Sequence, residues 1–183
     1  MLVWACFKSH IERLRAVLSH HNPAVITGDI PVSDSKADTD RVRQLYKFRN
    51  DPSCRVLIAT PHTLSEGVSL HHTTTHQLHV DRPYNAAMFL QSLDRTHRLG
   101  LPADADCSVT YLCASRLDGD RTIDWDVADA LHDKVTTMGA VLDDPDLLDL
   151  AIPEIDERKE LSELLFDEGA NSLLREVLKQ KQR

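Results

Sequence analysis

The sequence predicts an α/β fold, in which a mainly parallel sheet carries helices on both faces and an all-helical C-terminal tail follows. Two observations predict it. Over the first hundred residues, short apolar runs alternate with segments of helical periodicity, which is the pattern of βαβ units. After about residue 120, only helix-like segments follow. We therefore expect an α/β domain over residues 1–120 and an acidic helical extension over residues 121–183.

The expected strands are short and apolar, and several are rich in β-branched residues. They fall at residues 2–7, 24–27, 55–59, 77–80 and 108–112. The first is a continuous apolar run, which suits a strand covered on both faces. The third has the strongest strand signal, and Thr60 and Pro61 end it.

Helices are expected between these strands, because apolar residues there recur at helical spacing. They fall at residues 11–18, 42–49 and 85–95, and the tail adds residues 124–142, 146–150, 155–166 and 170–181. Ser9 is placed to cap the first helix. The leucine stripe over residues 161–178 could bind a partner, but we expect it to pack on its own domain.

The composition is that of a soluble globular protein, with 42% apolar and 27% charged residues in a chain of 183. No run of eighteen apolar residues occurs, so we expect no membrane span and no membrane partner. The four cysteines form no Cys-x-x-Cys pair, which favours free thiols and a cytoplasmic location.

Charge is distributed unevenly along the chain. Residues 1–100 hold 12 Lys and Arg against 9 Asp and Glu, whereas the remaining residues hold 9 against 20. The net charge of −8 excludes a basic surface over the whole protein. The first hundred residues could still bind a polyanion.

The most informative segment is QSLDRTHRLG at residues 91–100. Arg95 and Arg98 are three residues apart, so at a helix end they would share a face. Two guanidinium groups on one face suit a polyphosphate, because each is permanently charged and donates in a fork. Gln91 lies one turn before Arg95 and could orient a water or a side chain. For such an arginine pair taken alone, the alternative is a solvated surface helix.

Two other polar segments, residues 66–70 and 81–85, come after expected strands. Ligands of open α/β sheets bind outside the carboxyl ends of the strands. We therefore expect these two segments and the arginine segment to lie along the same edge of the sheet.

These segments together resemble a known family. The runs VWACF, VLIATPHTLSEGVSL, HVDRPYN and QSLDRTHRLG are similar, in this order, to motifs IV, V and VI of superfamily-two helicase-like ATPases. The last run is most similar to the Swi/Snf-type group of double-stranded DNA translocases. The resemblance covers residues 2–115 and implies a RecA-like lobe. Residues 65–69 depart from the usual Gly-x-Gly-x-Asn, and residues 83–85 replace the usual Trp-Asn-Pro.

In this family two RecA-like lobes clamp ATP, and the resemblance implies that this chain is the C-terminal lobe. Arg98 would be the arginine finger on the γ-phosphate. Arg95 would be its partner, either contacting phosphate or ordering the interface. The other residues expected around the nucleotide are Gln91, Gly67, Glu66 and Ser69.

The resemblance also implies a grip on double-stranded DNA. The residues that occupy matching places at the loop ends of motifs IV and V are Lys8, Ser9, Thr27, Gly28 and Thr60. Contacts of this kind hold phosphates and carry no sequence information. A cap or turn role is the alternative for each residue.

The sequence contains no Gly-x-x-x-x-Gly-Lys-Ser/Thr phosphate loop and no Asp-Glu-x-His. We therefore expect the chain not to hydrolyse ATP alone, and we expect an N-terminal lobe, in the same chain or a partner subunit, to hold Mg²⁺. The alternative is a stand-alone, non-catalytic lobe that serves as a protein or nucleic-acid interaction module. The histidines over residues 71–79 favour a solvated loop over a metal site.

Overall fold

The computed structural model of the chain describes residues 1–29, 40–64, 68–97, 101, 105–116 and 121–143. Its contacts divide the chain into two units, Met1–Lys134 and Val135–Arg183. The first unit holds the whole sheet. The domain boundary expected near residue 120 stays a prediction.

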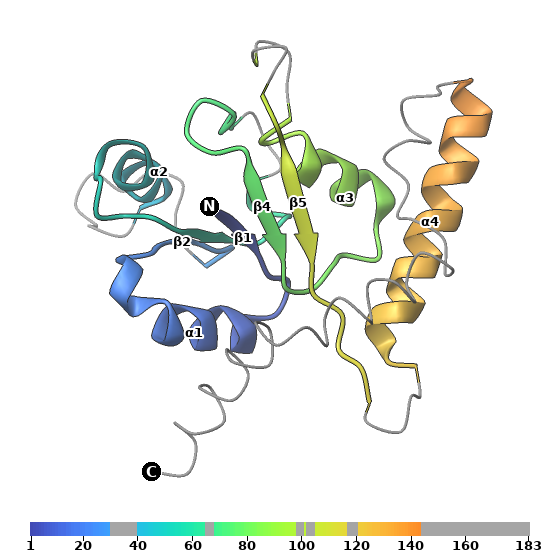
Figure 1. The fold of residues 1–183 in the computed structure, drawn as a ribbon, viewed down its shortest axis with the longest axis horizontal. Coiled ribbons are helices and arrows are strands. Elements are labelled where there is room, and N and C mark those ends of the chain that lie inside the picture. Colours follow the sequence, from blue (N-terminus) through green and yellow to red (C-terminus); the bar gives the residue numbers. More distant parts are fainter. Residues whose placement is uncertain (30–39, 65–67, 98–100, 102–104, 117–120, 144–183) are drawn as a thin grey trace. The chain divides into compact units, whose positions relative to one another are not determined.

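Five strands form one parallel sheet in the order β2-β3-β1-β4-β5 (Figure 1). They are β1 (Leu2–Trp4), β2 (Ala24–Ile26), β3 (Leu57–Ala59), β4 (His76–His79) and β5 (Ser108–Tyr111). Every neighbouring pair is parallel, which confirms the predicted α/β architecture. Because the strands are parallel, their ends define two different edges, the carboxyl edge and the amino edge.

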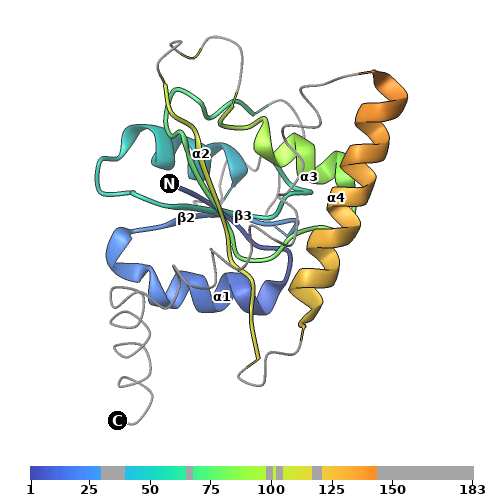
Figure 2. The same cartoon turned by 45° about the vertical axis from the view of Figure 1, so that its right-hand side comes forward.

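Helices cover both faces of the sheet, as predicted. One face packs against α2 (Arg41–Asn50), whose Phe48 joins the buried side chains of β1, β2 and β3. On the same face, Phe89 of α3 (Ala86–Leu93) lies against the rings of His79 and Tyr111. The opposite face packs against α1 (Lys8–Val17) through Ile11. Figure 2 shows α1 and α2 on opposite sides of the strands.

Of the three helices just described, α1, α2 and α3, two have a side-chain cap at the start. Asp40 caps α2 by accepting from Arg43 N, and Asn85 caps α3 by accepting from Met88 N at 3.1 Å. The predicted cap of α1 is wrong. Its cap position is Phe7, whose carbonyl accepts from the first-turn amides, so the helix starts at Lys8 and Ser9 lies inside its first turn.

Two further helices complete the described chain. A short 3-10 helix, η1 (Ser19–His21), joins α1 to β2, and α4 (Ile123–Leu142) matches the expectation for residues 124–142. The other helices expected in the tail, with their leucine stripe, lie outside the described residues.

None of the helices in the described ranges is long and apolar enough to cross a membrane. All four cysteines are free thiols, as their spacing predicts. Burial and the neighbouring Asp81 carboxylate raise the pKa of the Cys6 thiol, so this thiol stays protonated at neutral pH.

Candidate functional site

The described parts of the polar segments lie on two different edges of the sheet, so the prediction of one common edge is wrong. Residues 81–85 follow β4 and lie at the carboxyl edge. Residues 68–70 precede β4, and Arg95 follows α3, which runs back from the carboxyl end of β4 to the amino edge. In a parallel sheet, each connection must run from the carboxyl end of one strand back to the amino end of the next. Residues 68–70 and Arg95 both lie near the end of such a connection, and therefore at the amino edge.

The carboxyl edge gathers the residues expected to contact nucleic acid. Lys8, Ser9 and Gly28 are exposed there, and Thr27 and Thr60 are half-buried. The Lys8 ammonium pairs with Asp29 at 2.6 Å, and both side chains are well exposed. An exposed pair of this kind contributes about 0–1 kcal/mol, so a phosphate can compete for the lysine at little cost.

Asp81, two residues beyond the end of β4, holds the start of α1. One carboxylate oxygen of Asp81 accepts from Cys6 N, and the other lies 2.6 Å from His10 Nδ1. Asp81 is only 6% exposed. It therefore fixes the start of α1, which carries Lys8 and Ser9, relative to the sheet.

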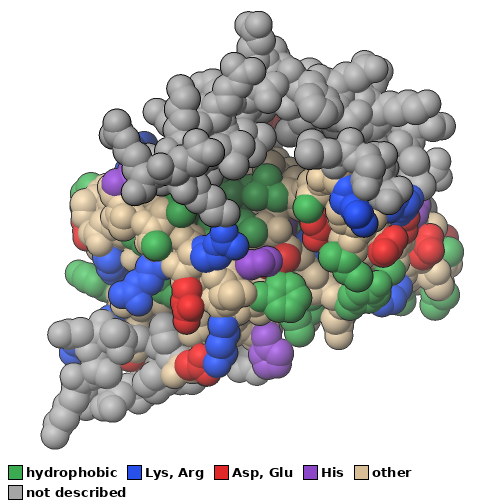
Figure 3. Space-filling model, turned by 90° about the horizontal axis from the view of Figure 1, so that it is seen from below, with side chains coloured by type: hydrophobic (Ala, Val, Ile, Leu, Met, Phe, Trp, Pro, Cys, Tyr) green, Lys and Arg blue, Asp and Glu red, His purple; other side chains and the backbone are tan. Residues whose placement is uncertain are grey.

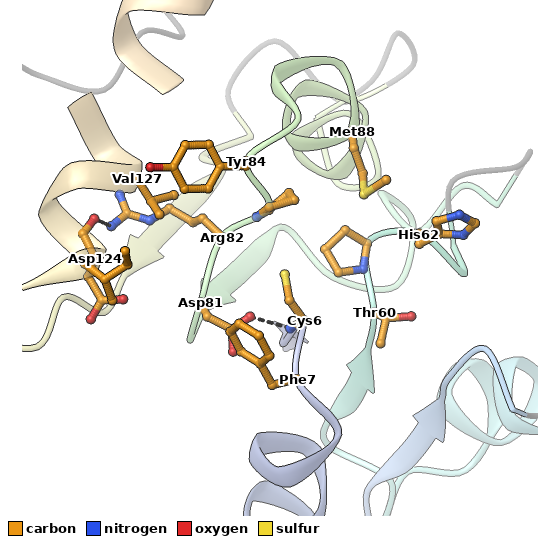
Figure 4. Close-up of a pocket in the computed structure, with 13 residues that line it drawn as sticks. Cys6, Phe7, Thr60, His62, Asp81, Arg82, Tyr84, Met88, Asp124 and Val127 are labelled. Carbon is orange, nitrogen blue, oxygen red and sulfur yellow. Dashed lines mark hydrogen bonds between the residues drawn. The ribbon is translucent and has the colours of Figure 1, made fainter. Parts of the chain in front are cut away.

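A pocket of about 460 Å³ opens at this edge, between the ends of β1, β3 and β4 and the first turns of α4 (Figure 4). Its walls are mainly apolar, and Phe7 and Tyr84 stand exposed beside it. Sequence reasoning missed this pocket, because its wall combines segments that are far apart along the chain.

Arg82 links this pocket wall to α4. Its guanidinium donates to Asp124 O at 2.7 Å and to Cys113 Sγ at 3.1 Å, and it lies over the Tyr111 ring. In Figure 3, which views this edge, basic side chains alternate with acidic ones, with histidines and with apolar groups. The described part of this face therefore carries scattered cations rather than one basic patch.

The amino edge holds Arg95 in a buried position. Helix α3 ends at Leu93, two residues earlier than expected, so Arg95 lies in the turn that follows the helix. Arg95 is 6% exposed. Its Nη1 donates to Val68 O at 3.1 Å, and its own carbonyl accepts from Leu70 N at 2.9 Å. Two hydrogen bonds thus join the arginine segment to residues 68–70.

Of the other residues expected at the nucleotide, the structure describes Gln91 and Ser69. Gln91 is exposed on α3, whereas Arg95 is buried, so the two do not share a surface. The Ser69 hydroxyl bonds His71 Nδ1, and the Ser69 carbonyl accepts from Arg49 at 2.8 Å. Arg98, Glu66 and Gly67 lie outside the described residues.

The histidines of residues 71–79 do not gather at one place, although the His71 and His72 ring centroids lie 3.7 Å apart. His76 is exposed, whereas His79 is completely buried between the Trp4, Phe89 and Tyr111 rings. Burial, with a smaller contribution from the Arg82 charge, lowers the pKa of His79 to about 3. Across the described residues, no group of three His, Cys, Asp or Glu is placed to hold a metal ion.

Comparisons with known proteins bear on the family of the chain and on its fold. The family described as "Helicase conserved C-terminal domain" matches residues 1–100. Among solved structures, the chain is similar to the C-terminal part of the Fun30 ATPase domain, with a TM-score of 0.52 and 20% identity. That match covers 74% of this chain and 47% of the other, so this chain spans about half of it. No curated protein matches the sequence.

Proposed function

Because this chain belongs to the helicase conserved C-terminal domain family, we propose that it is the C-terminal RecA-like lobe of an ATP-dependent, double-stranded DNA translocase of Swi/Snf type. The lobe supplies arginines to an ATP site whose phosphate loop belongs to an N-terminal lobe. Its carboxyl edge supplies part of a sequence-independent grip on DNA. The run QSLDRTHRLG supports the Swi/Snf assignment.

The observation that carries the proposal is the junction between residues 68–70 and Arg95. The family places motifs V and VI at the nucleotide, and in this chain the corresponding segments are bonded at 2.9 and 3.1 Å. A rigid junction of this kind limits how far the arginine segment moves when the two lobes close. Preorganised charge is worth more to catalysis than charge that must be ordered during the reaction.

The contacts of Arg95 favour the ordering role over a phosphate contact. Its guanidinium is enclosed and donates to Val68 O. We therefore assign the γ-phosphate to Arg98, where an arginine finger contributes about 10³–10⁵ in rate by stabilising charge on the transferring phosphoryl group. Gln91, exposed on α3, stays a candidate for orienting groups between the lobes, and Mg²⁺ is expected to be held by the N-terminal lobe.

The carboxyl edge suits phosphate contacts for two reasons. The first turn of α1 has no side-chain cap, and a helix N-terminus attracts anions. Lys8 and Ser9 are exposed at that turn, close to Thr27, Gly28 and Thr60 at the ends of β2 and β3. Such contacts predict binding that is independent of sequence and weakens with salt.

The test is the ATPase activity of this lobe assembled with an N-terminal RecA-like lobe, in one chain or as two subunits. We expect Arg98→Ala to reduce DNA-stimulated kcat by about 10³-fold or more while duplex binding stays nearly intact. Arg13→Ala removes an exposed arginine of α1 and serves as the matched control. Full activity of Arg98→Ala would overturn the assignment.

A further inference from the structure

Strand β4 contains a buried amide that belongs to none of the motifs. Gln77 is 2% exposed, and its side chain makes three hydrogen bonds. Its Oε1 accepts from Trp4 Nε1 at 2.7 Å, and its Nε2 donates to Leu93 O at 2.8 Å and to the hydroxyl of Thr96. Burying an amide is costly unless it is hydrogen-bonded, and an apolar side chain would fill this space without that cost.

Two of these bonds reach the turn that carries Arg95. The carbonyls of the last helical turn have no partner within the helix. Leu93 O, in that turn, accepts from Gln77 Nε2 and from the backbone amides of Thr96 and His97. Gln77 thus holds the residues on both sides of Arg95, which places the Arg95 guanidinium against Val68 O.

Trp4 determines which way the amide points. An indole N–H can only donate, so it selects the amide oxygen of Gln77 and directs the NH₂ group toward Leu93 and Thr96. Trp4 is the last residue of β1, and α1 starts four residues later, at Lys8. The same buried contacts therefore connect β1 with the arginine turn.

We propose that Gln77 is a positioning residue that holds the turn after α3, and through it Arg95, in the geometry required for ATP hydrolysis. This inference rests on the proposed function. Gln77 acts through the turn and contacts no nucleotide. Its bond to Trp4 couples that geometry to the central strand.

The first experiment measures backbone hydrogen exchange in this chain. Gln77→Met keeps the volume and removes all three bonds, and Thr96→Val removes one. We expect Gln77→Met to speed exchange of the amides of Leu70, Thr96 and His97 by about tenfold beyond any global loss of stability. The control is Gln44→Met, because Gln44 accepts from Val25 N at 3.0 Å at the opposite end of the sheet.

The second experiment measures ATPase kinetics in the assembled two-lobe enzyme. We expect Gln77→Met to lower kcat by about 10- to 100-fold with little change in KM for ATP, because misplacing a catalytic segment by about 1 Å has effects of this size. Trp4→Phe and Thr96→Val should lower kcat less, and Gln44→Met should leave it unchanged.

The outcomes separate this inference from the proposed function. Unchanged kcat in Gln77→Met, together with loss of activity in Arg98→Ala, would overturn the role of Gln77 and leave the proposed function standing. Unchanged kcat in both variants would overturn the proposed function as well. If the three amides exchange hydrogen at the same rates in Gln77→Met and in wild type, the inference is also contradicted, whatever the ATPase kinetics show.

Discussion

The two edges of the sheet are built differently. At the carboxyl edge, the residues proposed to contact DNA are exposed or half-buried, and Lys8 forms an exposed ion pair with Asp29. At the amino edge, Arg95 is buried and bonded to the backbone of a neighbouring segment. The first edge therefore exposes polar and charged groups, whereas the described part of the second holds a turn in position.

The largest effect is expected at the amino edge. Arg95→Ala removes the donor to Val68 O and leaves a buried gap. We expect a loss of about 1–3 kcal/mol in the free energy of unfolding, and about 100-fold in kcat of the assembled enzyme. Denaturant titration and ATPase kinetics measure the two effects. Wild-type kcat in a folded Arg95→Ala protein would show that the two edges do not differ in this way.

Between the two edges, His79 is buried among aromatic rings, so protonating it should lower the stability of the fold. Because the pKa of His79 is about 3 in the fold and about 6.5 when unfolded, the unfolded chain binds more protons between these values. Stability therefore falls as the pH drops below about 6.5, and His79 accounts for a loss of about 2 kcal/mol between pH 7 and pH 5.

Denaturant titrations at pH 7 and pH 5 test this expectation. His79→Phe keeps an aromatic ring at the site and should remove most of the pH dependence. The same pH dependence in His79→Phe and wild type would place its origin elsewhere.

A smaller effect is expected at the base of the carboxyl edge. Asp81→Ala leaves Cys6 N without its acceptor and frees His10, so we expect a loss of about 1.5 kcal/mol. Asp81→Asn keeps an oxygen for Cys6 N and should lose less. Thermal unfolding compares the two variants, and equal losses would indicate that the charge of Asp81 matters more than its acceptor geometry.

The smallest effect on stability is expected for the exposed cation itself. Lys8→Ala should change the free energy of unfolding by less than about 0.5 kcal/mol. In duplex DNA titrations at several salt concentrations, the slope of log binding constant against log salt concentration should become shallower by about 0.9, the value for one phosphate contact. A salt slope equal to that of wild type would remove Lys8 from the proposed grip.

Much of the fold follows from local patterns. Some features act through neighbours in the sequence, so their consequences can be predicted from it. They are the buried run at β1, the stop after β3 and the capping residues Asp40 and Asn85. The cap of α1 was predicted incorrectly because Phe7, held at the end of the Asp81-bound loop, starts the helix earlier than Ser9.

The sites were less predictable, because their contacts join residues that are distant in sequence. The motif at residues 91–100 indicates the family, but Arg95 is buried through contacts with residues 68–70. Gln77 appears in the sequence as an ordinary strand residue. Its partners Trp4 and Thr96 are brought to it only by the parallel pairing of β1 with β4 and by the return of α3.

The most direct measurement of the central claim is DNA-stimulated ATP hydrolysis by this chain alone, by the N-terminal lobe alone and by the two assembled. The account predicts turnover only in the assembly, because the arginines and the phosphate loop belong to different lobes. Turnover by this chain alone, or an assembly that binds DNA and ATP without hydrolysis, would contradict it.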